Sequence, residues 1–203
     1  MQLSQASSIA IRTCMNTQEN ERVLIIYDKN KRTIANSLLK EAEKITKYAN
    51  LTEIPNPKFN GQEPPKEVAK EMQNSDVILM PTSKSLSHTE ARRKASEKGA
   101  RIASMPGITE EIMKRTLTAD YHQITEISNK IMSILNKAYE NQEKIKITTE
   151  LGTDLEMQVN RELPQVSEGI FHKKGDWGNL PDGEAYFAPL ENHTNGTIII
   201  DAS

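Results

Sequence analysis

Short apolar runs alternate with amphipathic segments along the first 140 residues of the chain. Three runs have the length of a strand, at residues 23–27, 76–80 and 101–105, and residues 51–54 form a weaker strand signal. Other segments repeat apolar residues at helical spacing, at residues 3–15, 33–46, 64–72, 89–98, 109–117 and 119–139. Continuous apolar runs are typical of parallel strands that are covered on both faces. The pattern therefore predicts an α/β fold, with an open, mostly parallel sheet and helices on both faces.

The pattern changes after residue 140, where apolar and polar residues alternate. Two such stretches, at residues 145–149 and 155–159, flank the turn-forming sequence Gly152-Thr153-Asp154 and predict a β-hairpin. The dipeptide Asn195-Gly196 predicts a further turn, which leads into a strand at residues 197–200. The last part of the chain is therefore predicted to be rich in β-structure.

This change of pattern divides the chain in two. We predict a Rossmann-like α/β domain over residues 1–140. Residues 141–203 are predicted to be the β-rich beginning of a second domain, whose sheet is incomplete. A length of 203 residues is that of one large domain or two small ones.

Composition excludes several classes of function. Mean hydropathy is -0.63, no apolar run approaches the roughly 20 residues that span a bilayer, and the first residues do not form a signal peptide. We therefore expect no membrane partner. The net charge of -2 and the absence of a basic stripe argue against nucleic acid as a partner. The single cysteine, Cys14, excludes an internal disulfide and indicates a cytoplasmic location. Its helical spacing predicts a core position.

Polar residues follow three of the predicted strands, at the sheet edge where α/β proteins bind ligands. They are Asp28 and the segments 82–85 and 105–107. Neither GxGxxG nor GxxxxGK[ST] is present, so no nucleotide cofactor is predicted. Ser87 and Glu90 fit a capping box, in which two side chains bind the first N–H groups of a helix. His88, between them, is a candidate ligand contact.

A turn rich in proline, aspartate and glycine lies near the end of the sequence, in residues 177–189. Pro181 fixes its own φ, and Gly183 can adopt backbone angles closed to other residues. Glu184 should therefore leave a rigid turn at the first position of a strand. A metal ion or a reacting group needs a carboxylate held in this way, whereas a single carboxylate is more often only solvated.

Several stretches of the chain together resemble the metallo-aminopeptidases of the aminopeptidase T type, also called leucyl aminopeptidases. They are residues 23–28, 81–89, 99–107, 151–154, 177–189 and 196–203. The resemblance implies an N-terminal α/β domain, a C-terminal domain that holds two divalent metal ions, and short peptides as substrates. It also makes a homodimer plausible. Glu184 corresponds to the first metal ligand of the family, with the metal open among zinc, cobalt, manganese and magnesium.

The resemblance also implies an unfinished site, because the family's further ligands and a site tyrosine lie downstream of the matching block. The remaining histidines, His88, His122, His172 and His193, do not match those positions, and none forms an HExxH motif. We therefore expect an N-terminal portion of a metal-dependent aminopeptidase. Its catalytic residues are expected beyond Ser203, so the chain alone should be nearly inactive.

Two alternatives remain open. Dihydroxypyridine ring-opening dioxygenases are similar in sequence to this family and share much of its architecture, but they use a single iron. One carboxylate does not distinguish the two, since oxygen ligands accept several divalent ions. Alternatively, the α/β part is a non-enzymatic module that binds a small molecule or another subunit near Ser83, Ser85 and His88.

Overall fold

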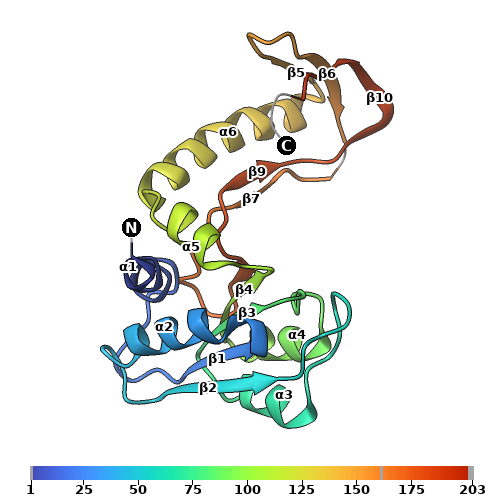
Figure 1. Ribbon diagram of the computed structural model, residues 1–203. Helices are drawn as coiled ribbons and strands as arrows, with labels where there is room; N and C mark the ends of the chain where they lie inside the picture. The colour runs from blue at the N-terminus through green and yellow to red at the C-terminus, as the bar shows by residue number, and fades with distance from the viewer. Residues whose placement is uncertain (1, 161, 201–203) are drawn as a thin grey trace. The chain divides into compact units, whose positions relative to one another are not determined.

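The computed structural model describes residues 2–160 and 162–200 of the chain, and Figure 1 shows the order of its elements. The helices are α1 (Leu3–Ser8), a π-helix (Ile9–Cys14), a 3₁₀ turn (Lys29–Lys31), α2 (Arg32–Ala42), α3 (Lys66–Met72), α4 (Glu90–Glu97), α5 (Glu110–Thr116) and α6 (Tyr121–Asn141). The strands are β1 (Val23–Asp28), β2 (Ala49–Ile54), β3 (Val77–Thr82), β4 (Arg101–Pro106), β5 (Lys144–Thr148), β6 (Asp154–Val159), β7 (Gln165–Ser167), β8 (Trp177–Asn179), β9 (Glu184–Tyr186) and β10 (Pro189–Thr197). None of the described helices is long and apolar enough to cross a membrane.

The central sheet has the strand order β2-β1-β3-β4-β8, and all its strand pairs are parallel. Val23 of β1 lies opposite both Ala49 of β2 and Val77 of β3. Helical crossovers connect β1 through β4, because parallel neighbours require the chain to return to the same edge before each new strand. The predicted α/β fold class is confirmed.

The last strand of this sheet, β8, comes from a distant part of the sequence. Trp177 pairs with Ile102 of β4, and Asn179 pairs with Ser104. The pattern of apolar residues does not predict this strand, because three residues next to a turn carry no periodicity. Its backbone covers the otherwise open edge of β4.

Both faces of the parallel sheet are covered by helices, as predicted. Successive side chains of a strand point to opposite faces. Leu24, Ile78 and Ile102 lie in one buried cluster with residues of α3 and α4. Ile25 and Leu79, which point the other way, are also fully buried, and α2 packs against β1 and α1. Burying an isoleucine or leucine contributes roughly 1.5–3 kcal/mol, so continuous apolar runs favour this two-sided arrangement.

A buried ion pair ties the first residue of β4 to the segment before β1. Arg101 is 7% exposed. Its guanidinium donates to both carboxylate oxygens of Glu21, at 2.8 and 2.7 Å, and to the backbone oxygen of Met15 at 3.1 Å. These bonds compensate the cost of removing the charge from water. No sequence pattern predicts the pair, because its members lie 80 residues apart.

A three-stranded antiparallel sheet has the order β10-β6-β5. The predicted β-hairpin is confirmed as β5 and β6. The turn predicted at Asn195-Gly196 is wrong, because both residues lie within β10, opposite Glu156 and Leu155. Gly196 has a φ of +131°, and a Cβ there would lie 2.1 Å from a backbone oxygen of β6. The glycine therefore marks a close approach of two strands. β10 also ends before most of the strand predicted at residues 197–200.

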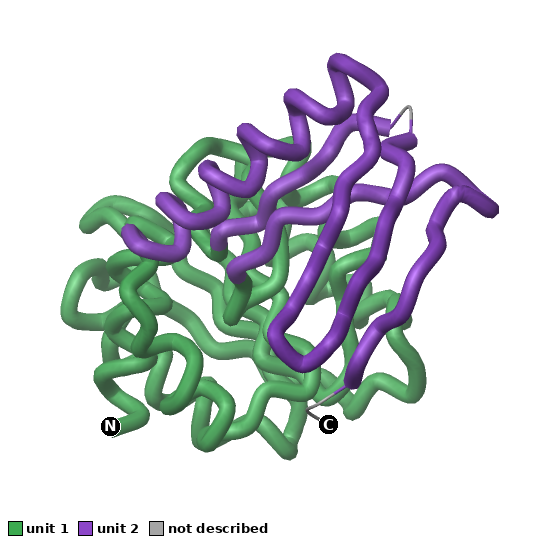
Figure 2. Tube along the Cα trace, turned by 90° about the horizontal axis from the view of Figure 1, so that it is seen from above, with its two compact units in different colours: residues 1–121, 169–182 green, residues 122–168, 183–203 purple. Residues whose placement is uncertain are grey.

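The chain forms two compact units, which Figure 2 colours separately. Unit 1 contains residues 1–121 and 169–182 and includes the parallel sheet. Unit 2 contains residues 122–168 and 183–203 and includes the β10-β6-β5 sheet and the β7-β9 pair. The domain division predicted near residue 140 stays a prediction.

Candidate functional site

Glu184, the predicted metal ligand, is the first residue of β9. β9 pairs in antiparallel fashion with β7, which places Ser167 opposite Glu184. The turn before it contains a cis peptide bond between Leu180 and Pro181. The N–H of the buried Leu180 donates to the backbone oxygen of Ser104 at 2.8 Å, which fixes the start of this turn in unit 1. Glu184 itself is exposed and begins the strand in unit 2.

No metal site gathers around Glu184 among the residues that the structure describes. Residues 2–160 and 162–200 contain no group of three or more His, Cys, Asp or Glu side chains that could hold an ion. A second carboxylate near the β7-β9 pair, Glu168, follows β7 directly, and one of its oxygens is buried without a hydrogen-bond partner. Glu168 lies just outside β7, and it does not complete a group of three potential ligands among the described residues. Glu184 as a metal ligand stays a prediction.

Two histidines are held by backbone carbonyl groups. A ring nitrogen of His172 lies 2.7 Å from the oxygen of Thr13, and a ring nitrogen of His193 lies 2.7 Å from the oxygen of Glu191. Within the described ranges, no histidine belongs to a group of potential metal ligands. These contacts hold the two rings in place.

Asp28, at the carboxyl end of β1, is fully buried. Its carboxylate accepts hydrogen bonds from the N–H of Ser83, from the Ser83 hydroxyl at 3.0 Å and from the N–H of Asn30 at 3.1 Å. Both carboxylate oxygens are used in this way. Asp28 therefore joins the ends of β1 and β3, and Ser83 serves the same junction.

The capping box predicted from Ser87 and Glu90 is wrong. The N-cap of α4 is Thr89, whose side-chain oxygen accepts from the N–H of Arg92 at 3.2 Å. The first two N–H groups of the helix donate to the carboxylate of Glu63, at 2.5 and 3.2 Å. The carboxylate of Glu63, in a distant loop, thus takes the place of the nearby side chain that a capping box uses. A short-range sequence pattern does not reveal such a contact.

His88, the candidate ligand contact, is exposed and belongs to a cluster around Trp177. The guanidinium carbon of Arg92 lies 3.7 Å from the centroid of the Trp177 ring, and its Nε donates to the backbone oxygen of Ser87 at 2.7 Å. The His88 ring meets Trp177 edge to face, with centroids 6.2 Å apart. Burial lowers the pKa of the Arg92 guanidinium. The sequence did not predict a role for Arg92, because its contact with Trp177 depends on the pairing of β8 with β4.

Cys14 is a core residue, as its spacing predicts. It is fully buried, and burial raises the pKa of its thiol to about 12. The thiolate is the reactive form of cysteine, so Cys14 is not an activated nucleophile.

Comparison with known proteins identifies a family and a fold. A family model described as "NicX: 2,5-dihydroxypyridine 5,6-dioxygenase" matches residues 9–203. The structure of a 2,5-dihydroxypyridine dioxygenase from Pseudomonas putida KT2440 aligns with a TM-score of 0.67 and 14% identity, over 97% of this chain and 58% of that one. Wild-type AmpT from Thermus thermophilus aligns with a TM-score of 0.54 and 15% identity, over 96% and 63%. At these identities the two structures show the fold alone. No curated protein sequence matches the chain significantly.

These findings correct the predicted activity. The metal-dependent aminopeptidase, and with it the hydrolase and protease assignments, is contradicted by the dioxygenase family that matches nearly the whole chain. The stretches that resemble aminopeptidase T reflect a fold that both solved structures share with this chain. The chain spans less than two thirds of the length of either solved protein. It belongs to the family described as NicX, 2,5-dihydroxypyridine 5,6-dioxygenase.

Proposed function

We propose that this chain is part of a ring-opening dioxygenase that acts on a dihydroxylated pyridine and uses a single iron ion. The observation that carries this proposal is the family match, which extends over residues 9–203. The α/β fold is compatible with it, but folds of this kind serve many reactions and do not identify one. Because the chain spans 58% of the length of the dioxygenase of known structure, the activity is proposed for the complete protein.

The described residues do not by themselves fit an iron site. Non-haem iron oxygenases hold the metal with several side chains, typically two histidines and a carboxylate. Here Glu184 is exposed, and no group of three potential ligands occurs in the part of the chain that the structure describes. We propose that Glu184 supplies one carboxylate oxygen to a divalent metal whose other ligands are not among the residues that the structure describes.

An oxygen-consumption assay tests the proposed reaction. The complete product of the gene is loaded anaerobically with Fe(II) and given 2,5-dihydroxypyridine and air. A dioxygenase incorporates both atoms of O₂, so the product should gain two oxygen atoms by mass spectrometry, and both should carry the label from ¹⁸O₂. The same preparation loaded with Zn(II) is the control. No loss of the pyridine with Fe(II) would refute the proposed function.

A separate measurement tests Glu184. Calorimetric titration with Mn(II), an air-stable substitute for Fe(II), compares the complete protein with its Glu184→Gln variant. Removing a residue that only hydrogen-bonds a metal ligand lowers metal affinity by about 10–100-fold. Loss of a ligand itself should therefore weaken Mn(II) binding by about tenfold or more. Glu191→Gln is the matched control, because Glu191 is also an exposed strand glutamate of unit 2. Equal affinity of the Glu184→Gln variant and the control would exclude Glu184 as a ligand.

A further inference from the structure

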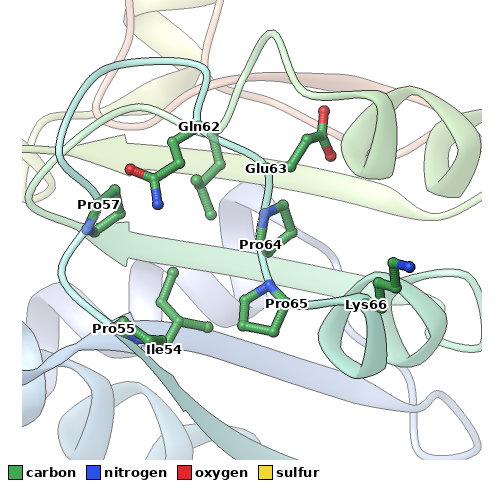
Figure 3. A pocket seen from close by; sticks show the side chains of 9 residues that line it. Ile54, Pro55, Pro57, Gln62, Glu63, Pro64, Pro65 and Lys66 are labelled. Atoms are coloured by element: carbon green, nitrogen blue, oxygen red, sulfur yellow. The ribbon is translucent and has the colours of Figure 1, made fainter.

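A cavity of about 400 Å³ lies in unit 1, at the carboxyl end of β2 (Figure 3). Its walls include the buried side chains of Ile54 and Leu86 and the rings of Pro57, Pro64 and Pro65. This volume is within the range of small-molecule sites, which are mostly apolar and carry few polar groups. Ligands of open α/β sheets also bind beyond the carboxyl ends of the strands. The cavity therefore has the size, the lining and the place of a ligand site.

The loop that forms the cavity, residues 55–65, is held in place by the rest of unit 1. The N–H of Gly61 donates to the backbone oxygen of Ser85 at 2.8 Å, and the N–H of Ser85 donates to the side-chain oxygen of Asn60 at 2.9 Å. The carboxylate of Glu63 accepts from the first two N–H groups of α4. Prolines add rigidity because their φ is fixed. A ligand would thus enter a formed site, which lowers the cost of ordering the loop on binding.

One hydrogen-bond donor faces this cavity. The N–H of Lys58 donates to the side-chain oxygen of Gln62 at 2.7 Å, which fixes the orientation of the amide. The other end of the amide, Nε2, has no hydrogen-bond partner among the residues that the structure describes, and Figure 3 shows it directed toward Ile54. The carboxylate of Glu63 points away from the cavity in the same view. The exposed Lys66 also belongs to the lining, and Figure 3 shows its amine directed away from Ile54. The space beside Ile54 therefore offers apolar contact and one oriented N–H donor, while the two charged groups of the lining point away from it.

We propose that this cavity binds a small, neutral, flat molecule with one hydrogen-bond acceptor, such as an aromatic ring nitrogen or a ring carbonyl. The ring system packs between the prolines and Ile54, and its acceptor receives the hydrogen bond from Gln62 Nε2. A charged ligand is disfavoured, because it would lose its hydration among the prolines and Ile54 while Glu63 and Lys66 point away from them. An extended peptide is disfavoured, because the proline walls carry no backbone N–H to pair with it. The lining of this cavity does not include Glu184, and the proposal does not depend on the proposed function.

The test uses quinoline, a flat two-ring molecule with one ring nitrogen, and naphthalene, which has the same shape without an acceptor. Each is titrated into the ¹⁵N-labelled chain, and backbone amide shifts are followed by NMR. We expect saturable shifts at Ile54, Gln62 and Leu86, with quinoline bound about three- to tenfold more tightly, the factor that one net hydrogen bond provides. The absence of saturable shifts at these three amides, or equal binding of the two probes, would overturn the proposal.

Variants separate the donor from the shape of the cavity. Gln62→Leu keeps the side-chain volume and removes the N–H donor, so it should bind quinoline and naphthalene equally. Gln73→Leu is the matched control, because Gln73 is another half-buried glutamine of unit 1 that does not line this cavity. It should preserve the preference for quinoline. A Gln62→Leu variant whose spectrum retains the folded pattern and which still prefers quinoline would contradict the role of Gln62.

Discussion

Replacing Arg101 with methionine measures how far its buried ion pair stabilises unit 1. Methionine retains much of the apolar length of the side chain but removes every N–H donor, so the carboxylate of Glu21 loses its charged partner and keeps only the N–H of Gln18, at 2.9 Å from Oε2. Removing one member of a buried ion pair costs about 3–5 kcal/mol, mainly because a charge is left without compensation. The side chain of Glu21 is 17% exposed, so water partly solvates the remaining carboxylate. We therefore expect the lower end of this range, about 3 kcal/mol.

Urea unfolding followed by tryptophan fluorescence provides the measurement. Trp177 is the only tryptophan of the sequence and pairs with Ile102, the neighbour of Arg101. With a slope of about 2 kcal/mol per molar urea, the midpoint should fall by about 1.5 M. Arg22→Met is the control, because the Arg22–Asp76 pair is 56% and 37% exposed and should contribute less than about 1 kcal/mol. Equal shifts of the two midpoints would refute the reasoning.

Three further predictions test other parts of the structure. Because burial raises the pKa of the Cys14 thiol to about 12, Ellman's reagent at neutral pH should not react with the native chain, yet should release one equivalent after denaturation; native reactivity would contradict this. Gly196→Ala should destabilise the β6-β10 pair by more than about 1 kcal/mol, measured by amide exchange of β6. Gly61→Ala, measured by amide exchange of unit 1, shares the strain of a positive φ (+83°) but has open space around its Cβ, so it should cost less; equal effects would count against the close approach. Hydrogen bonds from Arg22 hold the pKa of the Asp76 carboxyl below its usual range. The ionised carboxylate therefore stabilises the fold at pH values above the pKa of the unfolded chain, and this stabilisation is lost as the pH falls. The unfolding free energy of Asp76→Asn should therefore change less than that of the wild type between about pH 5 and pH 2, and parallel curves would exclude this linkage.

The candidate site was only partly predictable from the sequence. Pro181 and Gly183 correctly indicated that Glu184 begins a strand, because a turn's backbone angles depend on its own residues. The chemistry was not predictable in this way. Stretches such as residues 99–107 contain the β4 strand and its turn, which are features of the fold and not of one reaction. Activity depends on ligands brought together from several segments, and the family match over residues 9–203 replaced the aminopeptidase prediction for that reason.

The sequence by itself determined the parallel sheet. The runs that became β1, β3 and β4 are mostly apolar because both faces of each strand are buried, and this requirement is visible in consecutive residues. Only the tertiary structure decided that Trp177 joins the edge of β4, that Glu63 caps α4 and that Arg101 binds Glu21. Each of these contacts joins segments that are distant in sequence and uses polar groups that many partners satisfy equally well. Which partner is used depends on which groups the folded chain brings within hydrogen-bond distance.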